Sequence, residues 1–148
     1  MANVIELCTM PEKEQQWDLL YLADPDKDMV MKYLVDGRMF AVFEGDDCVS
    51  EAVTFVRQSD HQLELKNLAT REDAQHKGYA TMLIEHIRAV NKGKYDWLYV
   101  GTAFFGLYEH WGFVYAYTVE NFFVDNYPEP IIDEGRQCID MVYFRLQL

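Results

Sequence analysis

Residues 75–80 read Gln75-His76-Lys77-Gly78-Tyr79-Ala80 and separate a strand-like run, Gln62 to Thr70, from a helix-like run, Gly78 to Asn91. Glycine adopts left-handed turns without strain, so Gly78 is expected to open the helix. The first main-chain N–H groups of a helix lack partners within it and carry the positive end of its dipole. The stretch therefore predicts an anion site suited to phosphate or pyrophosphate. An ordinary strand-to-helix turn with one glycine is the alternative reading.

The segments around this turn predict an α/β fold with a mixed sheet. Apolar residues follow helical spacing between Tyr79 and Val90, and a further strand is expected over Tyr95 to Val100. Strand, helix and strand in succession imply one parallel pair. Upstream, strands over Met39 to Glu44 and Val49 to Val56 surround a hairpin-type turn at residues 45–47, which implies antiparallel pairing as well.

The ends of the chain complete this order of elements. The first third predicts a short strand followed by two helices, and the last third predicts a short helix, a strand, a loop and a final strand. The expected ranges are Asn3 to Thr9, Glu12 to Leu22, Asp26 to Leu34, Ala103 to Trp111, Phe113 to Thr118, Asn126 to Arg136 and Cys138 to Leu146.

Composition restricts the class of protein. A chain of 148 residues with half of them apolar fits one globular domain with its own core. No apolar run approaches the ~18 residues that span a bilayer, and no signal peptide is visible, so we expect a cytoplasmic protein with no membrane partner. The three cysteines, Cys8, Cys48 and Cys138, lie far apart with no histidine cluster beside them, which predicts reduced thiols and no metal site.

The net charge of −12 is unevenly distributed. Residues 1–60 carry −8 and residues 109–148 carry −5, whereas residues 61–108 carry +1. Such an acidic chain is expected to repel nucleic acid, because phosphate-backbone binding needs a basic surface. The pattern fits an anionic ligand held in the middle and a cationic partner drawn to the acidic flanks. An acidic surface that serves solubility alone is the alternative.

Two blocks of sequence together resemble a known family. Neither a Gly-x-Gly-x-x-Gly fingerprint nor a Walker motif is present. Leu63-Glu64-Leu65-Lys66-Asn67-Leu68-Ala69-Thr70, followed by residues 75–80, resembles the acetyl-CoA motif of the GNAT family of N-acetyltransferases. Leu107-Tyr108-Glu109-His110-Trp111-Gly112-Phe113 resembles the family's second motif, and the tail resembles a small bacterial subgroup. The resemblance implies one GNAT-like domain over residues 1–148, with a mixed sheet and flanking helices.

The resemblance also implies an activity. GNAT enzymes move the acetyl group of acetyl-CoA to a primary amine by direct attack in a ternary complex, so we expect acetyl-CoA as co-substrate. The acceptor is expected to be a small-molecule or peptide amine of cationic character, given the acidic flanks. A non-catalytic acyl-CoA-binding sensor is the alternative, and many relatives pair into homodimers through sheet edges or late strands.

Residues of the cofactor site follow from the same resemblance. In the family, the strand before the turn diverges from its neighbour, and pantetheine lies in the gap. Main-chain groups of Leu68 and Thr70 are expected to hold it, with the Leu68 amide polarising the thioester carbonyl. The diphosphate is expected at the turn, whose residues are Gln75, His76, Lys77, Gly78, Tyr79 and Ala80, with Arg71 and Lys77 adding positive charge.

Two side chains match the family's acid and base. Tyr108 matches the general acid that protonates the leaving CoA thiolate, although it also fits an apolar stripe with Phe104, Leu107 and Trp111. Glu64 stands 11 positions before Gln75, where the histone-acetylating branch carries its catalytic glutamate. Because Glu64 and Lys66 share a strand face, simple pairing of the two is the alternative.

One departure from the family pattern concerns the segment before the tyrosine. The family usually places a longer stretch there, often with an asparagine, whereas residues 101–106 are abrupt and contain none. Gly106 also weakens a short helix by ~1 kcal/mol relative to alanine. We therefore expect the helix that carries Tyr108 to start late or to be mobile.

Overall fold

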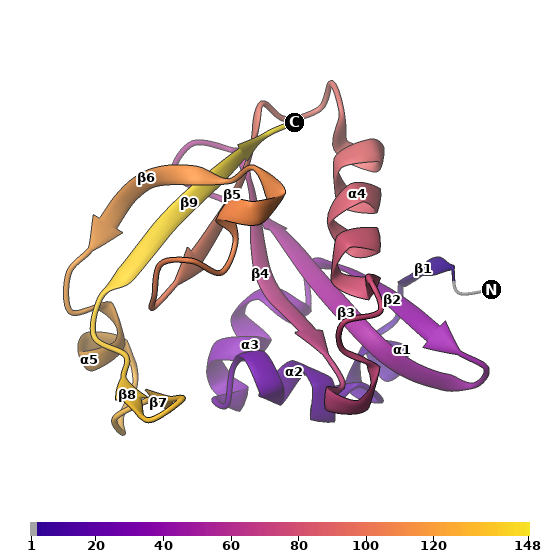
Figure 1. Ribbon diagram of the computed structural model, residues 1–148, viewed down its shortest axis with the longest axis horizontal. Helices are drawn as coiled ribbons and strands as arrows, with labels where there is room; N and C mark the ends of the chain where they lie inside the picture. Colours follow the sequence, from indigo (N-terminus) through magenta and orange to yellow (C-terminus); the bar gives the residue numbers. More distant parts are fainter. Residues whose placement is uncertain (1–2) are drawn as a thin grey trace.

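A computed structural model of the protein describes residues 3–148. Its main feature is a seven-stranded mixed sheet in the order β1-β2-β3-β4-β5-β9-β6 (Figure 1). The β4–β5 pair is parallel and the other neighbours are antiparallel. The strands are β1 (Val4–Leu7), β2 (Arg38–Glu44), β3 (Asp47–Val56), β4 (Leu63–Thr70), β5 (Trp97–Thr102), β6 (Val114–Val119) and β9 (Met141–Gln147). The predicted mixed sheet is confirmed.

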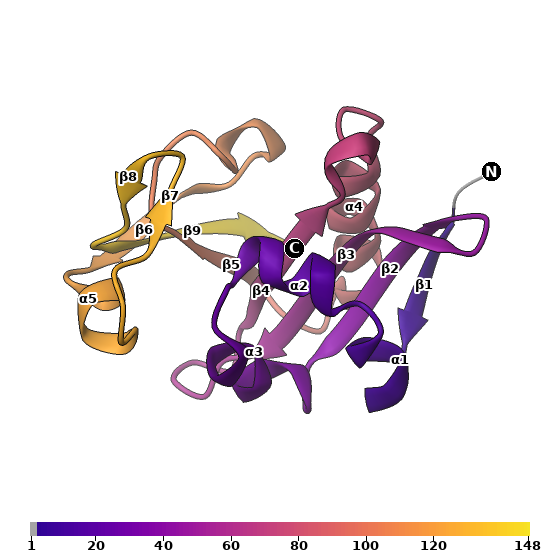
Figure 2. The same cartoon turned by 90° about the horizontal axis from the view of Figure 1, so that it is seen from below.

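Alternation along β2 explains why helices cover both faces of the first half of the sheet. Phe40 and Val42 join a core with α4 (Tyr79–Asn91), whereas Met39 and Ala41 join a second core with α2 (Trp17–Ala23) and α3 (Lys27–Leu34). Successive strand side chains point to opposite faces, so four apolar residues in a row require cover on both. Figure 2 shows α4 on one side of β2–β4 and the N-terminal helices on the other.

The N-terminal helices are held by specific polar contacts. Thr9 and Glu12 form a capping box at the start of α1 (Met10–Glu14). The buried ammonium of Lys13 donates 2.8 Å bonds to the carbonyls of Leu34, the last residue of α3, and of Gly37 just beyond it. The predicted single helix Glu12 to Leu22 is wrong, because the chain breaks at Gln15 and Gln16 into α1 and α2.

The central unit matches the strand–helix–strand prediction. A 3₁₀ turn at Glu72–Ala74 connects β4 to α4, and β5 follows beside β4 in the same direction. Leu83, Ile84 and Ile87 on one stripe of α4 are buried against the sheet. This stripe has the three- and four-residue spacing expected of a helix packed on one side.

The C-terminal part contains elements that the sequence did not predict. The loop expected over Asn126 to Arg136 holds the hairpin β7 (Ile132–Asp133) and β8 (Arg136–Gln137), preceded by α5 (Phe122–Asn126). The helix expected over Ala103 to Trp111 is reduced to a 3₁₀ turn, Glu109–Trp111, so the expectation of a late start is confirmed. In Figure 1, α5 and the hairpin lie across an opening from α3, below the point where the two halves of the sheet diverge.

Candidate active site

The strands β4 and β5 separate soon after they pair. Their register covers only Leu63 to Leu65 opposite Leu98 to Val100, although β4 continues to Thr70 and β5 to Thr102. Lys66 stands at the point of separation as an extra residue, because Leu65 and Asn67 oppose consecutive residues of β3. A bulge of this kind bends its strand. Beyond Leu65 the two strands therefore diverge. Figure 1 shows β4 and β5 running apart with a V-shaped opening between their ribbons.

A cavity of about 440 Å³ lies beyond the end of β4 on one side of this opening. Leu68, Thr70 and Gln75, all predicted to bind the cofactor, line it together. The Gln75 side chain donates a 3.2 Å bond to the Thr70 carbonyl, which ties the turn to the strand end. Thr70 is fixed in turn by a 2.8 Å contact between its hydroxyl and that of Ser50 on β3.

The turn before α4 presents its amides to solvent. His76 and Gly78 have positive φ angles of 63° and 86°, and Gly78 is the N-cap of the 13-residue helix α4. Within residues 3–148, the main-chain N–H groups of residues 76–80 donate to no protein acceptor. Successive free amides at a left-handed turn form an anion-binding concavity, and the helix dipole adds to it. These residues fit the diphosphate of coenzyme A.

Side chains around the turn contribute less positive charge than expected. The Lys77 ammonium lies 3.4 Å from a Glu44 carboxylate oxygen, and the Tyr79 hydroxyl donates a 2.8 Å bond to the same oxygen. The Tyr79 bond, more than Lys77, lowers the pKa of the Glu44 carboxyl. Arg71 is likewise paired with Asp73 at 2.6 Å. Both predicted cations therefore have acidic partners on the surface, and the main chain supplies the anion site.

Tyr108 lies at the N-cap of the 3₁₀ turn and is half-buried. Its ring packs against Trp111 and Phe113 at centroid distances of 5.9 and 5.6 Å. Burial, with a smaller contribution from the Glu51 carboxyl, raises the pKa of Tyr108 to about 12. The hydroxyl therefore keeps its proton at neutral pH and is available as a donor.

Two contacts position Tyr108 in place of the missing helix. The Glu109 carboxylate accepts main-chain bonds from Gly106 at 2.8 Å and from Tyr108 at 3.2 Å. The Trp111 indole donates a 2.9 Å bond to the Thr81 hydroxyl in the first turn of α4. The sequence analysis missed the role of Glu109; an acidic residue three positions after Gly106 is the signal that indicates it.

Glu64 lies on the other side of the opening, in a cavity of about 220 Å³. Its side chain is 10% exposed, and one carboxylate oxygen is 3.1 Å from the Lys66 ammonium. The pairing considered as an alternative is therefore present. The cavity is lined from α3, β4, β5 and the C-terminal segment by Asp24, Met29, Lys32, Tyr33, Phe55, Glu64, Leu65, Lys66, Gly101, Phe122, Tyr127 and Met141.

A polar link missed by the sequence analysis closes this cavity. The Asp24 carboxylate accepts bonds from Tyr33 at 3.3 Å and from Tyr127 at 3.2 Å. Tyr127 lies 103 residues further along the chain, so the link joins the turn before α3 to the segment after α5. The pKa of the Asp24 carboxyl is raised, mainly because the group is buried. No local sequence pattern indicates a contact over this separation.

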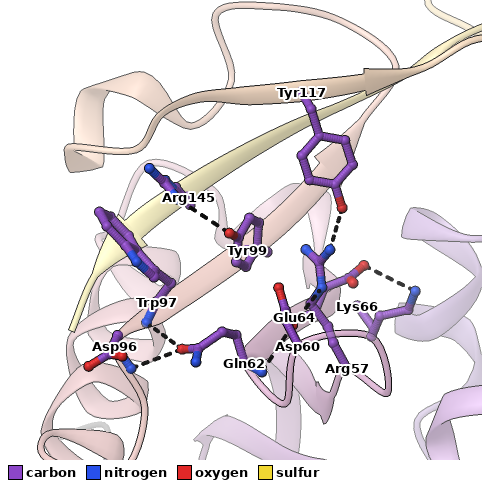
Figure 3. A network of polar contacts seen from close by, with 10 residues as sticks. All are labelled: Arg57, Asp60, Gln62, Glu64, Lys66, Asp96, Trp97, Tyr99, Tyr117 and Arg145. Carbon is purple, nitrogen blue, oxygen red and sulfur yellow. Dashed lines mark hydrogen bonds and ion pairs between the residues drawn. The ribbon is translucent and has the colours of Figure 1, made fainter.

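An arginine among aromatic rings borders the same cavity (Figure 3). The Arg57 guanidinium lies 4.0 Å from the centroid of Tyr99, donates to the Tyr117 hydroxyl and pairs with Asp60 at 3.4 Å. Phe122 lines the cavity that holds Glu64, and Tyr117 lines the adjoining hollow.

Other classes of site find no support among the described residues. In residues 3–148 no group of three or more His, Cys, Asp or Glu side chains is arranged to hold a metal ion. No helix in that range is long and apolar enough to cross a membrane. Cys8, Cys48 and Cys138 are free thiols.

Comparison with known proteins places this geometry in a family. The model of the acetyltransferase (GNAT) domain matches residues 36–115. The uncharacterized N-acetyltransferase YvbK of Bacillus subtilis (strain 168) is 33% identical over 143 residues, which cover 91% of this chain and 90% of the relative.

Solved structures agree over nearly the whole chain. A GNAT family acetyltransferase from Elizabethkingia anophelis with acetyl-CoA bound has a TM-score of 0.86 at 29% identity, covering 99% of this chain and 98% of that one. A Bacillus subtilis acetyltransferase in complex with CoA has a TM-score of 0.84 at 29% identity, covering 100% and 99%. The chain belongs to the GNAT family, and it is an acetyl-CoA-dependent acyltransferase.

Proposed function

We propose that the protein, as a single domain over residues 1–148, transfers the acetyl group of acetyl-CoA to a primary amine by direct attack in a ternary complex. The observation that carries the proposal is the divergence of β4 from β5 after Leu65 and Val100. The free amides of residues 76–80 lie beyond the end of β4 on one side of the opening, and the cavity that contains Glu64 lies on the other side. The two reactants therefore have separate places that meet at one strand.

The cofactor side of the proposal rests on main-chain groups. We assign the diphosphate to the turn formed by Gln75, His76, Lys77, Gly78, Tyr79 and Ala80, and the pantetheine arm to Leu68 and Thr70. Beyond Leu65, β4 pairs only with β3 within residues 3–148, which leaves its other edge available for a ligand. The acetyl-CoA and CoA bound in two related structures support this assignment.

The acceptor side supplies the base. An amine with a pKa near ~10.4 is mostly protonated at neutral pH and must lose a proton before it attacks. Glu64, directly or through water, is the group placed to take that proton. Since Lys66 pairs with Glu64, the acceptor has to share or replace this partner. A new C–N bond then forms at the acetyl carbonyl, and the Leu68 amide stabilises charge that develops on its oxygen.

Tyr108 completes the transfer as the general acid. When the C–S bond breaks, the sulfur leaves as a thiolate with a pKa near ~8.5. The pKa of Tyr108, raised to about 12, keeps the proton on its hydroxyl at neutral pH, so the acid form is the one present when the sulfur leaves. A donor that is protonated at every physiological pH suits a step in which negative charge appears on the leaving group.

The charge and assembly of the acceptor complex are further parts of the proposal. The excess of 25 acidic over 13 basic residues favours the approach of a cationic acceptor at long range. A homodimer through β6 is supported by its position at the sheet edge and by exposed Val114, Tyr115 and Val119. Light scattering on the purified protein tests the dimer.

The experiment that tests the activity is a thiol-release assay with a panel of primary amines at fixed acetyl-CoA. We expect amine-dependent CoA release and, when both substrates are varied, intersecting double-reciprocal lines. Parallel lines would indicate a covalent enzyme intermediate and contradict direct attack. Binding of acetyl-CoA by calorimetry without release for any amine would instead favour the sensor.

A further inference from the structure

The Glu64–Lys66 pair places a fixed cation and a fixed anion together in the acceptor cavity. The Lys66 ammonium is 3.1 Å from a Glu64 carboxylate oxygen, and the two side chains are 29% and 10% exposed. The same ammonium lies 5.7 Å from the centre of the Tyr33 ring. Figure 3 shows both side chains leaving β4 at its bulge. Glu64 and Lys66 stand two positions apart on β4, so strand periodicity places both side chains on one face.

An acceptor that carries only positive charge suits this pair poorly. To reach Glu64, its ammonium must share the carboxylate with Lys66 or replace it, and replacement leaves a partly buried lysine without a counter-ion. The other carboxylate of the cavity, Asp24, already accepts bonds from Tyr33 and Tyr127. Lys32 adds a further cation at the rim, whereas Arg57 in the adjoining hollow is already paired with Asp60. The displaced lysine would therefore meet more positive than free negative charge.

We propose that the acceptor is an amino acid whose amine and carboxylate are attached to the same carbon, with the amine facing Glu64 and the carboxylate facing Lys66. This inference rests on the proposed function and names its substrate class. One carbon between the two charged groups matches two protein charges that lie 3.1 Å apart. Both protein charges keep an opposite partner during exchange, so neither is left desolvated and unpaired.

The rest of the cavity accommodates a side chain. Met29, Phe55, Phe122 and Met141 provide apolar and aromatic walls around the pair. Such walls bind the apolar part of a ligand, while a few polar groups fix its orientation. The first amine proton passes to Glu64, and the C–N bond forms as the C–S bond breaks. Tyr108 gives its proton to the thiolate, and the second proton released by the nitrogen restores the Tyr108 hydroxyl, so the amide and free CoA leave with Glu64 holding one proton for solvent.

The test compares acceptors that differ only in the carboxylate. Tyrosine with tyramine, tryptophan with tryptamine, and lysine with cadaverine form three such pairs, each assayed for kcat/KM by CoA release. We expect the amino acid to be the better acceptor by about tenfold or more in at least one pair, the size typical of a charge-assisted contact. Equal or faster turnover of the decarboxylated amine in all three pairs would overturn the inference.

Variants of Lys66 separate recognition from a structural role. Lys66→Met should remove the preference for the carboxylate, and Lys66→Arg should retain part of it. Lys94→Met, at an exposed lysine that lines neither this cavity nor the adjoining hollow, is the matched control and should keep the preference. An unchanged preference in Lys66→Met would contradict the assignment even if overall turnover fell. Absence of release with every amine would refute the proposed function itself, whereas release confined to amines without a carboxylate would refute only this inference.

Discussion

The two sides of the V-shaped opening are built from different parts of the chain. On the cofactor side, the groups offered to a ligand are main-chain amides at residues 76–80 and the free edge of β4 after Leu65. On the acceptor side, they are side chains brought from α3, β4 and the C-terminal segment. A main-chain site tolerates many side chains but depends on backbone conformation, whereas a side-chain site depends on each residue.

This contrast explains why one family can share a cofactor and differ in acceptors. Ions bound by amides need only a glycine-permitted turn and a helix start. The acceptor cavity instead combines Asp24, Glu64 and Lys66 with residues as far along the chain as Tyr127 and Met141. Substitution there changes what is recognised without disturbing the sheet, as expected where function is grafted on a common fold.

The largest effect is expected from Tyr108→Phe, which removes the acid and keeps the ring. Loss of a positioned general acid typically lowers turnover by about 10²–10⁴. The packing against Trp111 and Phe113 should survive, so the dissociation constant for acetyl-CoA by calorimetry should stay unchanged. Tyr115→Phe is the control, because its exposed hydroxyl contacts only Thr118 within residues 3–148. An unaltered kcat in Tyr108→Phe would remove this tyrosine from the mechanism.

The pKa of Tyr108 adds a pH dependence to the same prediction. Because the pKa is raised to about 12, the acid form persists as pH rises, and its loss begins only near that value. We expect kcat to show no alkaline decline attributable to Tyr108 below about pH 10, where an unperturbed tyrosine would be half ionised. A decline of kcat below about pH 10 that disappears in Tyr108→Phe would contradict the raised pKa of Tyr108.

A smaller effect is expected from Gly78→Ala on the cofactor side. A Cβ at Gly78 meets no atom within 4 Å, but the φ of 86° is strained for any residue with a side chain. The cost of about 1–2 kcal/mol is relieved by moving the turn, which should weaken acetyl-CoA binding by roughly tenfold. Gly45→Ala, at φ 61° in the β2–β3 hairpin with equal space, should lower the melting temperature similarly and leave binding intact. Equal affinity of the two variants for acetyl-CoA would show that the turn at Gly78 does not bind the cofactor.

The difference between the two sides also decides what the sequence could reveal. Gly78, the strand before it and the helix after it are local patterns, and their arrangement was predicted correctly. The divergence of β4 was inferred only through resemblance to the family. The helix predicted around Tyr108 is too long. Tyr108 instead begins a 3₁₀ turn, because the Glu109 carboxylate accepts main-chain bonds from Gly106 and Tyr108 where a first helical turn was expected.

The acceptor side was largely beyond local patterns. The proximity of Glu64 and Lys66 follows from strand periodicity and was anticipated, but the bulge that makes Lys66 an extra residue depends on pairing with β3. The Asp24–Tyr127 bond joins segments that no spacing rule connects. Residues 126–136 contain two prolines and Gly135, which predicted a loop; the β7–β8 pair forms there because a two-residue turn at Glu134 and Gly135, both at positive φ, closes a hairpin.

Glu51, on β3 between the two sides, allows a test of stability alone. Both carboxylate oxygens are buried and have no partner within residues 3–148. Burial raises the pKa of Glu51 well above 4.5, so the folded state keeps a proton that the unfolded chain releases. Stability is therefore full below about pH 4.5 and falls as the pH rises toward the folded pKa.

Glu51→Gln should remove this loss, since glutamine carries no proton to release. Thermal or urea unfolding should show the variant gaining on the parent as the pH rises above about 4.5, by about 1.4 kcal/mol for each unit of upward shift. Glu44→Gln should show the opposite dependence of stability on pH. The bond from Tyr79 lowers the pKa of Glu44, so the stability that the Glu44 carboxylate contributes is lost as pH falls. If the stabilities of the parent and of Glu51→Gln change with pH in parallel, Glu51 is ionised in the folded protein.

The smallest effect, and the one that isolates the acceptor side, is expected from Tyr127→Phe. The substitution removes the 3.2 Å bond from the Tyr127 hydroxyl to Asp24 and keeps the ring against the cavity. One such bond contributes about 0.5–1.5 kcal/mol, so KM for the acceptor should rise by a few-fold. Asp24 keeps its bond from Tyr33, and no contact of Tyr127 reaches the turn at residues 76–80. Acetyl-CoA affinity should therefore not change. An equal loss of affinity for both substrates would mean that the C-terminal segment stabilises the whole opening rather than its acceptor side alone. The main-chain cofactor site and the side-chain acceptor site would then not be independent.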